Sequence, residues 1–80
     1  MKKQPPRVSA RKVFASNVRK VRRLADISQE ELAHRCEMSR TYLSEIEREL
    51  RNVSIDNMDR IAIALNRPLS DLVDPGLFAD

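Results

Sequence analysis

Eighty residues suffice for one domain, and chains of this size bury only a modest core. They seldom enclose a pocket of the usual ~300 Å³ or more, which argues against catalysis on a large substrate. The 41% hydrophobic fraction contains no apolar run near the ~18 residues of a transmembrane helix. The basic start, MKKQPPRVSARKV, is followed by no apolar stretch, so we expect no secretory signal. A single cysteine fits a reducing compartment, and we expect a soluble, cytoplasmic protein without membrane contact.

The net charge of +3 hides an uneven distribution. Residues 1–25 hold nine bases and no acid, whereas residues 26–80 hold six arginines against all twelve acids. A basic part joined to a mixed body suits nucleic acid or another anionic surface, but a solvated helix face with a tail gives the same pattern. We interpret residues 1–8, which include Pro5-Pro6, as a flexible basic arm and residues 9–80 as the domain.

The first part of the domain predicts two helices. One runs from Ser9, its N-cap, to near Asp26, a residue that tolerates the left-handed backbone with which many helices end. Ser28 opens the second through a capping box, in which its hydroxyl accepts from the Glu31 N–H and the Glu31 carboxylate reaches back to Ser28. This second helix breaks around residues 37–38. The apolar stripe of the first helix comprises Ala10, Phe14, Val18, Val21 and Ala25.

Three more helices complete the prediction. Ser39 caps the third, Ser54 caps the fourth, which stops at Asn66, and Pro68 starts a short fifth that closes at residues 75–76. No segment alternates with the period of a strand, so the predicted fold class is all-α: a compact bundle of five short helices. The inner faces of the second to fifth helices are assigned to Leu32, Ala33, Cys36, Leu43, Ile46, Ile55, Met58, Ile61, Ala62, Leu65, Leu69, Leu72 and Val73.

The most informative stretch is QEELAHRCEMSRTYLSEIE, residues 29–47. It predicts two short helices joined by about four residues. Ala33 is small where the second helix must cross the first, Met38 plugs the turn, and Leu43 with Ile46 anchors the second helix. This is the pattern of a helix-turn-helix, and within the predicted five-helix bundle it resembles that of lambda repressor-like domains. The second helix of such a motif enters the DNA major groove, which is ~12 Å wide.

From Phe14 to Val73 the chain resembles the phage-repressor-like (XRE, Cro/CI-type) helix-turn-helix domains. Two positions depart from the family pattern, which usually has glycine where this chain has Asp26 and Glu37; a non-glycine residue at positive φ costs roughly 1 kcal/mol. The resemblance rests on Val18-Arg19, Val21-Arg22, Ser28-Gln29-Glu30-Glu31-Leu32-Ala33, Ser39-Arg40, Leu43-Ser44, Ile46-Glu47 and Ala64-Leu65 to Leu72. Within the family, the stretches Arg40-Thr41-Tyr42-Leu43-Ser44, Ile46-Glu47-Arg48 and Arg51-Asn52 with Ser54 look most similar to the controller proteins of restriction–modification systems.

The third helix presents side chains that can read DNA. Arg40 can bond to guanine through two hydrogen bonds, and Gln29 lies where the positive end of its helix favours a phosphate. The resemblance implies DNA contacts for Arg51 and Asn52 and an internal ion pair between Arg22 and Glu47. The same polar residues could instead be solvated surface, Arg48 above all. The predicted DNA-binding set is Gln29, Ser39, Arg40, Thr41, Tyr42, Ser44, Arg48, Arg51 and Asn52.

We find no pattern for metal binding or catalysis. His34 and Cys36 are two residues apart, the wrong spacing for one helix face, and the chain has no other cysteine or histidine. No sequence context arranges a serine, a histidine and an aspartate as a triad. We therefore expect no enzyme, no metal, no cofactor and no small-molecule ligand.

The C-terminal part is more apolar than a solvated end requires. Its side chains either cap the core or form a symmetric dimer patch. The resemblance favours the dimer, and the predicted interface is Leu69, Leu72, Val73 and Phe78.

The sequence thus predicts a homodimeric, sequence-specific DNA-binding regulator that binds double-stranded DNA at a palindromic operator, most similar to an autoregulatory controller of a restriction–modification system. A phage-type repressor or an antitoxin DNA-binding subunit is an alternative within the same class. A protein-interaction module that has kept the fold without binding DNA is an alternative of another class.

Overall fold

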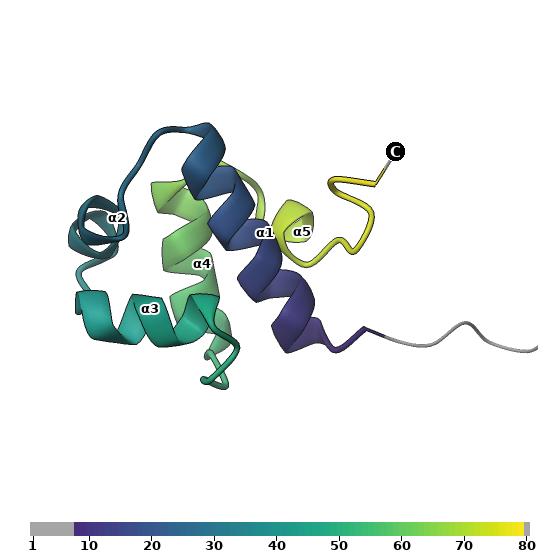
Figure 1. The fold of residues 1–80 in the computed structure, drawn as a ribbon, viewed down its shortest axis with the longest axis horizontal. Coiled ribbons are helices and arrows are strands. Elements are labelled where there is room, and N and C mark those ends of the chain that lie inside the picture. The colour runs from purple at the N-terminus through teal and green to yellow at the C-terminus, as the bar shows by residue number, and fades with distance from the viewer. Residues whose placement is uncertain (1–7, 80) are drawn as a thin grey trace, which may run out of the picture.

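The structure, a computed structural model, describes residues 8–79, and in this part of the chain five helices and no strand occur (Figure 1). The predicted all-α bundle is therefore confirmed. Most of the predicted N-terminal arm, residues 1–7, lies outside the described residues, as does Asp80; Val8 is exposed. The helices are α1 (Ala10–Leu24), α2 (Gln29–Cys36), α3 (Arg40–Glu47), α4 (Ile55–Ala64) and α5 (Leu69–Leu72).

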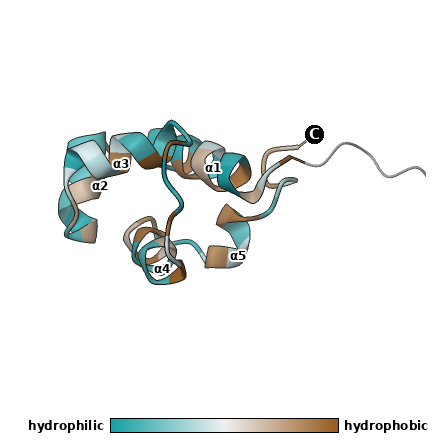
Figure 2. Ribbon diagram, turned by 90° about the horizontal axis from the view of Figure 1, so that it is seen from below, coloured by the Kyte–Doolittle hydropathy of each residue, from teal (hydrophilic) through white to brown (hydrophobic). Residues whose placement is uncertain are grey.

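The helices form two layers. Figure 2 shows α1, α2 and α3 on one side and α4 with α5 on the other. Packing links α2 to α3 and α4, α1 to α3 and α5, and α4 to α5. None of the helices in residues 8–79 has the length and apolar character that a membrane span requires.

Four serines begin the four long helices. The hydroxyls of Ser9, Ser28, Ser39 and Ser54 each accept a hydrogen bond from the backbone N–H three residues later, at 3.0–3.1 Å. All four caps were predicted from sequence and are confirmed. The second half of the predicted capping box is wrong, because the Glu31 carboxylate accepts from Arg35 Nε at 3.0 Å instead of reaching back to Ser28.

The same four helices end at non-glycine residues in the left-handed conformation: Asp26, Glu37, Glu49 and Asn66, with φ between 55° and 66°. After each one, the next backbone N–H bonds the carbonyl five residues before it, at 2.9–3.0 Å, which closes the helix end. The turn between α2 and α3 therefore keeps the geometry that glycine usually provides, with Glu37 at φ 57° and ψ 42°.

The core lies between the layers, around Val18, Leu32, Leu43, Ile61 and Leu72, which are all fully buried. Sequence periodicity predicted most of this core, since Phe14, Val21, Ala33, Cys36, Ile46, Ala62 and Leu65 are also buried.

Four residues depart from the predicted inner faces. Ile55, the first residue of α4, is 68% exposed, and Val73, directly after α5, is 39% exposed. Ala10 and Ala25, expected in the stripe of α1, are also exposed at its two ends.

Candidate DNA interface

One side of α3 carries polar side chains that the fold leaves accessible. Arg40, Ser44 and Arg48 recur every four residues and so share a face, and Thr41 lies beside them. Arg40, Thr41 and Arg48 are exposed and Ser44 is half-buried, whereas Leu43, Ile46 and Glu47 are buried. Neither Arg40 nor Arg48 forms an ion pair with the described residues. Their guanidinium donors can therefore bind a partner outside the molecule.

The buried side of α3 is held by an ion pair. Arg22 Nε lies 2.7 Å and Nη2 lies 2.9 Å from the two carboxylate oxygens of Glu47, so the pair is bidentate. The Glu47 side chain is only 2% exposed. The hydrogen bond that Arg22 donates to Glu47 raises the pKa of the Arg22 guanidinium above its ordinary value. Arg22 also donates from Nη1 to the Ile27 carbonyl at 2.9 Å. This pair, which the resemblance implied, fixes α3 to α1 and to the start of α2.

Gln29 belongs to the same network. It is half-buried at the first position of α2, and its Nε2 donates to Glu47 Oε1 at 3.0 Å. Because a carboxylate only accepts, this contact turns the amino group of the amide toward Glu47. The second hydrogen of Nε2 forms no bond within residues 8–79. Gln29 therefore has an internal role that sequence reasoning missed, and it keeps one donor for a phosphate.

Arg19 closes the other end of α3. Its Nη1 donates to the Glu47 backbone carbonyl at 3.0 Å, among the carbonyls that a helix leaves unbonded at its C-terminus. Sequence reasoning did not assign this role, because the position of the carbonyl depends on how α3 crosses α1.

Tyr42 and Arg51 pack against one another beside α3. Tyr42 is half-buried, and its hydroxyl accepts from Asn57 Nδ2 at 3.2 Å, which joins α3 to α4. The Arg51 guanidinium lies 5.4 Å from the centre of the Tyr42 ring, and its Nη2 lies 3.4 Å from Glu45 Oε1. Tyr42 is thus tied into the fold more than its predicted contact with DNA implied, while its hydroxyl hydrogen can still be donated. Ser39 is exposed, and its oxygen caps α3.

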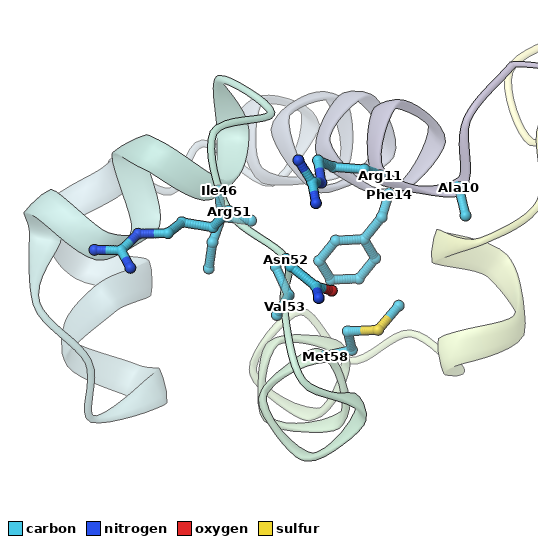
Figure 3. Close-up of a pocket in the computed structure, with 8 residues that line it drawn as sticks. All are labelled: Ala10, Arg11, Phe14, Ile46, Arg51, Asn52, Val53 and Met58. Atoms are coloured by element: carbon cyan, nitrogen blue, oxygen red, sulfur yellow. The ribbon is translucent and has the colours of Figure 1, made fainter.

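A cavity of about 180 Å³ lies under the loop between α3 and α4 (Figure 3). Phe14, Ile46, Val53 and Met58 line its apolar part, and the Asn52 side chain points toward it, while Arg51 points away toward α3. The volume is below the ~300 Å³ that ligand pockets usually have. Arg51 and Asn52 are both exposed.

The predicted dimer residues divide into three groups. Leu72 is 0% exposed and belongs to the core of its own chain, so its assignment to a subunit interface is wrong. Leu69 is half-buried and Val73 is exposed, both on α5 or directly after it. Phe78 is exposed beside Lys20 of α1, with 5.4 Å between the ammonium nitrogen and the ring centre.

Comparison with known proteins agrees with this geometry. Residues 18–72 match the helix-turn-helix family HTH_3. The control protein C.BamHI of Bacillus amyloliquefaciens is 46% identical over 65 residues, which cover 80% of each chain. The restriction-modification controller protein C.AhdI of Aeromonas hydrophila has a crystal structure that superposes with a TM-score of 0.75 at 34% identity, over 78% of this chain and 94% of that one.

A further solved structure includes DNA. The master regulator for biofilm formation SinR, in complex with DNA, superposes with a TM-score of 0.72 at 29% identity, over 76% of this chain and 98% of that one.

Proposed function

Because the chain belongs to the helix-turn-helix family HTH_3, which is not an enzyme family, we propose that it is a sequence-specific DNA-binding regulator. Its similarity to C.BamHI and C.AhdI supports the narrower role of a restriction–modification controller that regulates its own gene. The observation that carries the proposal is the face of α3 formed by Arg40, Thr41, Ser44 and Arg48, held outward by the buried ion pair behind it.

In this role α3 enters the major groove. Arg40 lies at the first position of α3, where recognition helices contact base edges, and its fork of donors matches the O6 and N7 atoms of guanine. Thr41 can contact a thymine methyl group, and Ser44 reaches backbone or bound water. Arg48, one turn further along, extends the same face.

The residues around α3 bind the DNA backbone and set the position of the helix. Gln29 donates to a phosphate at the N-terminus of α2, whose aligned amides favour an anion. Ser39, Tyr42, Arg51 and Asn52 supply further donors on the other side of α3. Phosphate contacts of this kind orient a protein without reading sequence, whereas the base contacts of α3 specify the site.

We propose a homodimer that uses the exposed side of α5. Leu69 and Val73 remain accessible after Leu72 is assigned to the core. Helix-turn-helix dimers bind half-sites about one helical turn apart, ~34 Å, so we expect a palindromic operator with this spacing. Val73→Glu should produce monomers and weaken operator binding; a sedimentation mass equal to that of the unchanged protein would remove this interface.

The test of DNA recognition is selection from a random duplex library at physiological salt, followed by affinity measurements on the selected site. We expect a palindrome with half-sites one turn apart. Arg40→Ala removes one guanine contact from each half-site and should weaken binding roughly 5- to 150-fold per half-site, as the loss of ~1–3 kcal/mol per contact implies. Arg51→Ala should weaken binding to all sequences alike and reduce the salt slope by about 1.

The matched control is Arg60→Ala, an exposed arginine on α4, whose affinity for the operator should change less than about twofold. Selection that enriches no sequence, or equal losses for Arg40→Ala and Arg60→Ala, would contradict the proposed recognition face. The role also places the protein in the cytoplasm, which fractionation with an antibody against the chain would test.

A further inference from the structure

A second surface of the molecule lies along the outer side of α1. Lys12, Ser16, Lys20 and Arg23 follow one another at intervals of four, four and three residues and so share a face of this helix. The C-terminal segment, residues 75–79, runs beside them. Two shallow depressions meet here. The first lies between this segment and α1. The second is lined by Lys20, Arg23, Leu24 and Phe78, and it shares Lys20 and Phe78 with the first.

This outer α1 face, defined by Lys12, Lys20, Arg23, Leu24 and Phe78, is positively charged. Its three cations are exposed, and none forms an ion pair with the described residues. Among residues 8–79, no acidic side chain lines either depression. Three unpaired cations in a row favour an anionic partner.

The face also carries accessible apolar area. Leu24 is 69% exposed and Phe78 is 36% exposed. The Lys20 ammonium rests 5.4 Å from the centre of the Phe78 ring, which keeps cation and ring next to each other. A partner that buries Leu24 and Phe78 gains free energy that a purely polar partner does not gain, because apolar burial contributes roughly 25 cal/mol per Å².

The face is separate from the recognition helix. The side of α1 toward α3 carries Arg19 and Arg22, which bond Glu47. Asn17, which lines one of the depressions, donates to the carbonyls of Asp71, Leu72 and Asp74 at 2.9–3.3 Å and so fixes the segment that leads to Phe78. Figure 1 shows α3 and the C-terminal segment on opposite sides of α1. A partner can therefore occupy this face while α3 lies in DNA.

We propose that the outer α1 face binds an acidic amphipathic helix of another protein. From Lys12 to Leu24 the face spans on the order of 18 Å at 1.5 Å per residue, which a partner helix of about twelve residues matches. Carboxylates of the partner pair with Lys12, Lys20 and Arg23, while its apolar residues cover Leu24 and Phe78. DNA fits less well, because a phosphate backbone offers nothing to the two apolar side chains. A second copy fits less well too, since a twofold contact would set the cations of one copy against those of the other.

The experiment uses a fluorescein-labelled fourteen-residue peptide with glutamate and leucine placed on opposite sides of a helix, and a scrambled peptide of the same composition. Fluorescence anisotropy with the full chain at about 0.1 M salt should show the ordered peptide binding at least tenfold more tightly than the scrambled one. Lys20→Glu combined with Arg23→Glu should weaken this binding at least tenfold, and Phe78→Ala several-fold.

Arg35→Glu combined with Arg60→Glu changes the net charge equally on exposed positions of α2 and α4, and should leave peptide binding within about twofold. The proposal does not depend on the proposed DNA function, since the peptide is bound in the absence of DNA. Affinity for the selected operator should be unchanged in the Lys20/Arg23 variant. Equal binding of both peptides, or equal loss in the two charge reversals, would overturn it. Loss of operator affinity in the Lys20/Arg23 variant would make the face a phosphate surface, and a changed sedimentation mass would make it a contact between copies; either result also overturns the proposal.

Discussion

Replacement of Glu47 by alanine tests the ion pair on which the orientation of α3 depends. The change removes the carboxylate that accepts from Arg22 Nε at 2.7 Å, Arg22 Nη2 at 2.9 Å and Gln29 Nε2 at 3.0 Å. The Arg22 side chain, 10% exposed, then keeps its charge without a counter-ion. Removal of one partner from a buried pair costs about 3–5 kcal/mol, against about 4–12 kcal/mol of total stability for a chain of this length. Since 1 kcal/mol shifts Tm by about 4–8 °C at this size, the midpoint should fall by roughly 12–40 °C.

Thermal and urea unfolding followed by circular dichroism measure this loss, and Glu31→Ala is the matched control. Glu31 pairs with Arg35 at 3.0 Å, but both side chains are nearly half exposed, so its loss should stay within about 1 kcal/mol. The double variant Arg22→Met with Glu47→Leu should recover most of the stability, because no buried charge is left without a partner. The reasoning would be refuted if Glu47→Ala were as stable as Glu31→Ala, or if the double variant were less stable than Glu47→Ala.

Three more predictions concern the interior and the turn. Glu37→Gly relieves a left-handed backbone at φ 57° and should raise the free energy of unfolding by about 1 kcal/mol in urea titrations; no gain would show that the turn is unstrained. Leu72→Ala removes side-chain volume from the core and should lower that free energy by about 2–5 kcal/mol, whereas a stable, monomeric variant would return Leu72 to a subunit interface. Burial raises the pKa of the Cys36 thiol, so the folded state holds a proton that the unfolded state loses above about pH 8.5. Stability should therefore fall as pH rises beyond that value, and Cys36→Ala should lack this part of the decline.

Local signals in the sequence predicted the helices well. Each of Ser9, Ser28, Ser39 and Ser54 caps the helix that the pattern assigned to it, because an N-cap bond joins residues only three apart. The left-handed stops at Asp26 and Asn66 were predicted from another local signal, since aspartate and asparagine tolerate this conformation. The stop at Glu49 was not predicted, since a glutamate seldom adopts this conformation and gives no sequence signal for it.

Features that depend on the packing of distant segments were harder to predict. Leu72 and Val73 are neighbours in sequence, yet one is fully buried and the other exposed, and periodicity cannot assign so short a helix to one face. The bond from Gln29 to Glu47 spans 18 residues and that from Arg19 to Glu47 spans 28. Both follow from the angle at which α3 crosses α1 and α2. The residues of the α3 face were predicted, because helical spacing and side-chain chemistry alone define them.

Each of α1, α2, α3 and α4 is followed by a joint, a residue in the left-handed conformation. These four joints also bear on how the sequence can change during evolution. Backbone hydrogen bonds close each joint, so the side chains of Asp26, Glu37, Glu49 and Asn66 can be replaced without loss of those bonds. Glycine would relieve roughly 1 kcal/mol at each of Glu37 and Glu49, about 2 kcal/mol together, and less at Asp26 and Asn66, because aspartate and asparagine tolerate this conformation. Changes at the exposed α3 residues should cost within about 0.5 kcal/mol each, whereas changes at the buried Leu43, Ile46 and Glu47 behind them destabilise the fold more. Glycines at the joints can offset such losses, which leaves the recognition helix room to acquire a new target sequence.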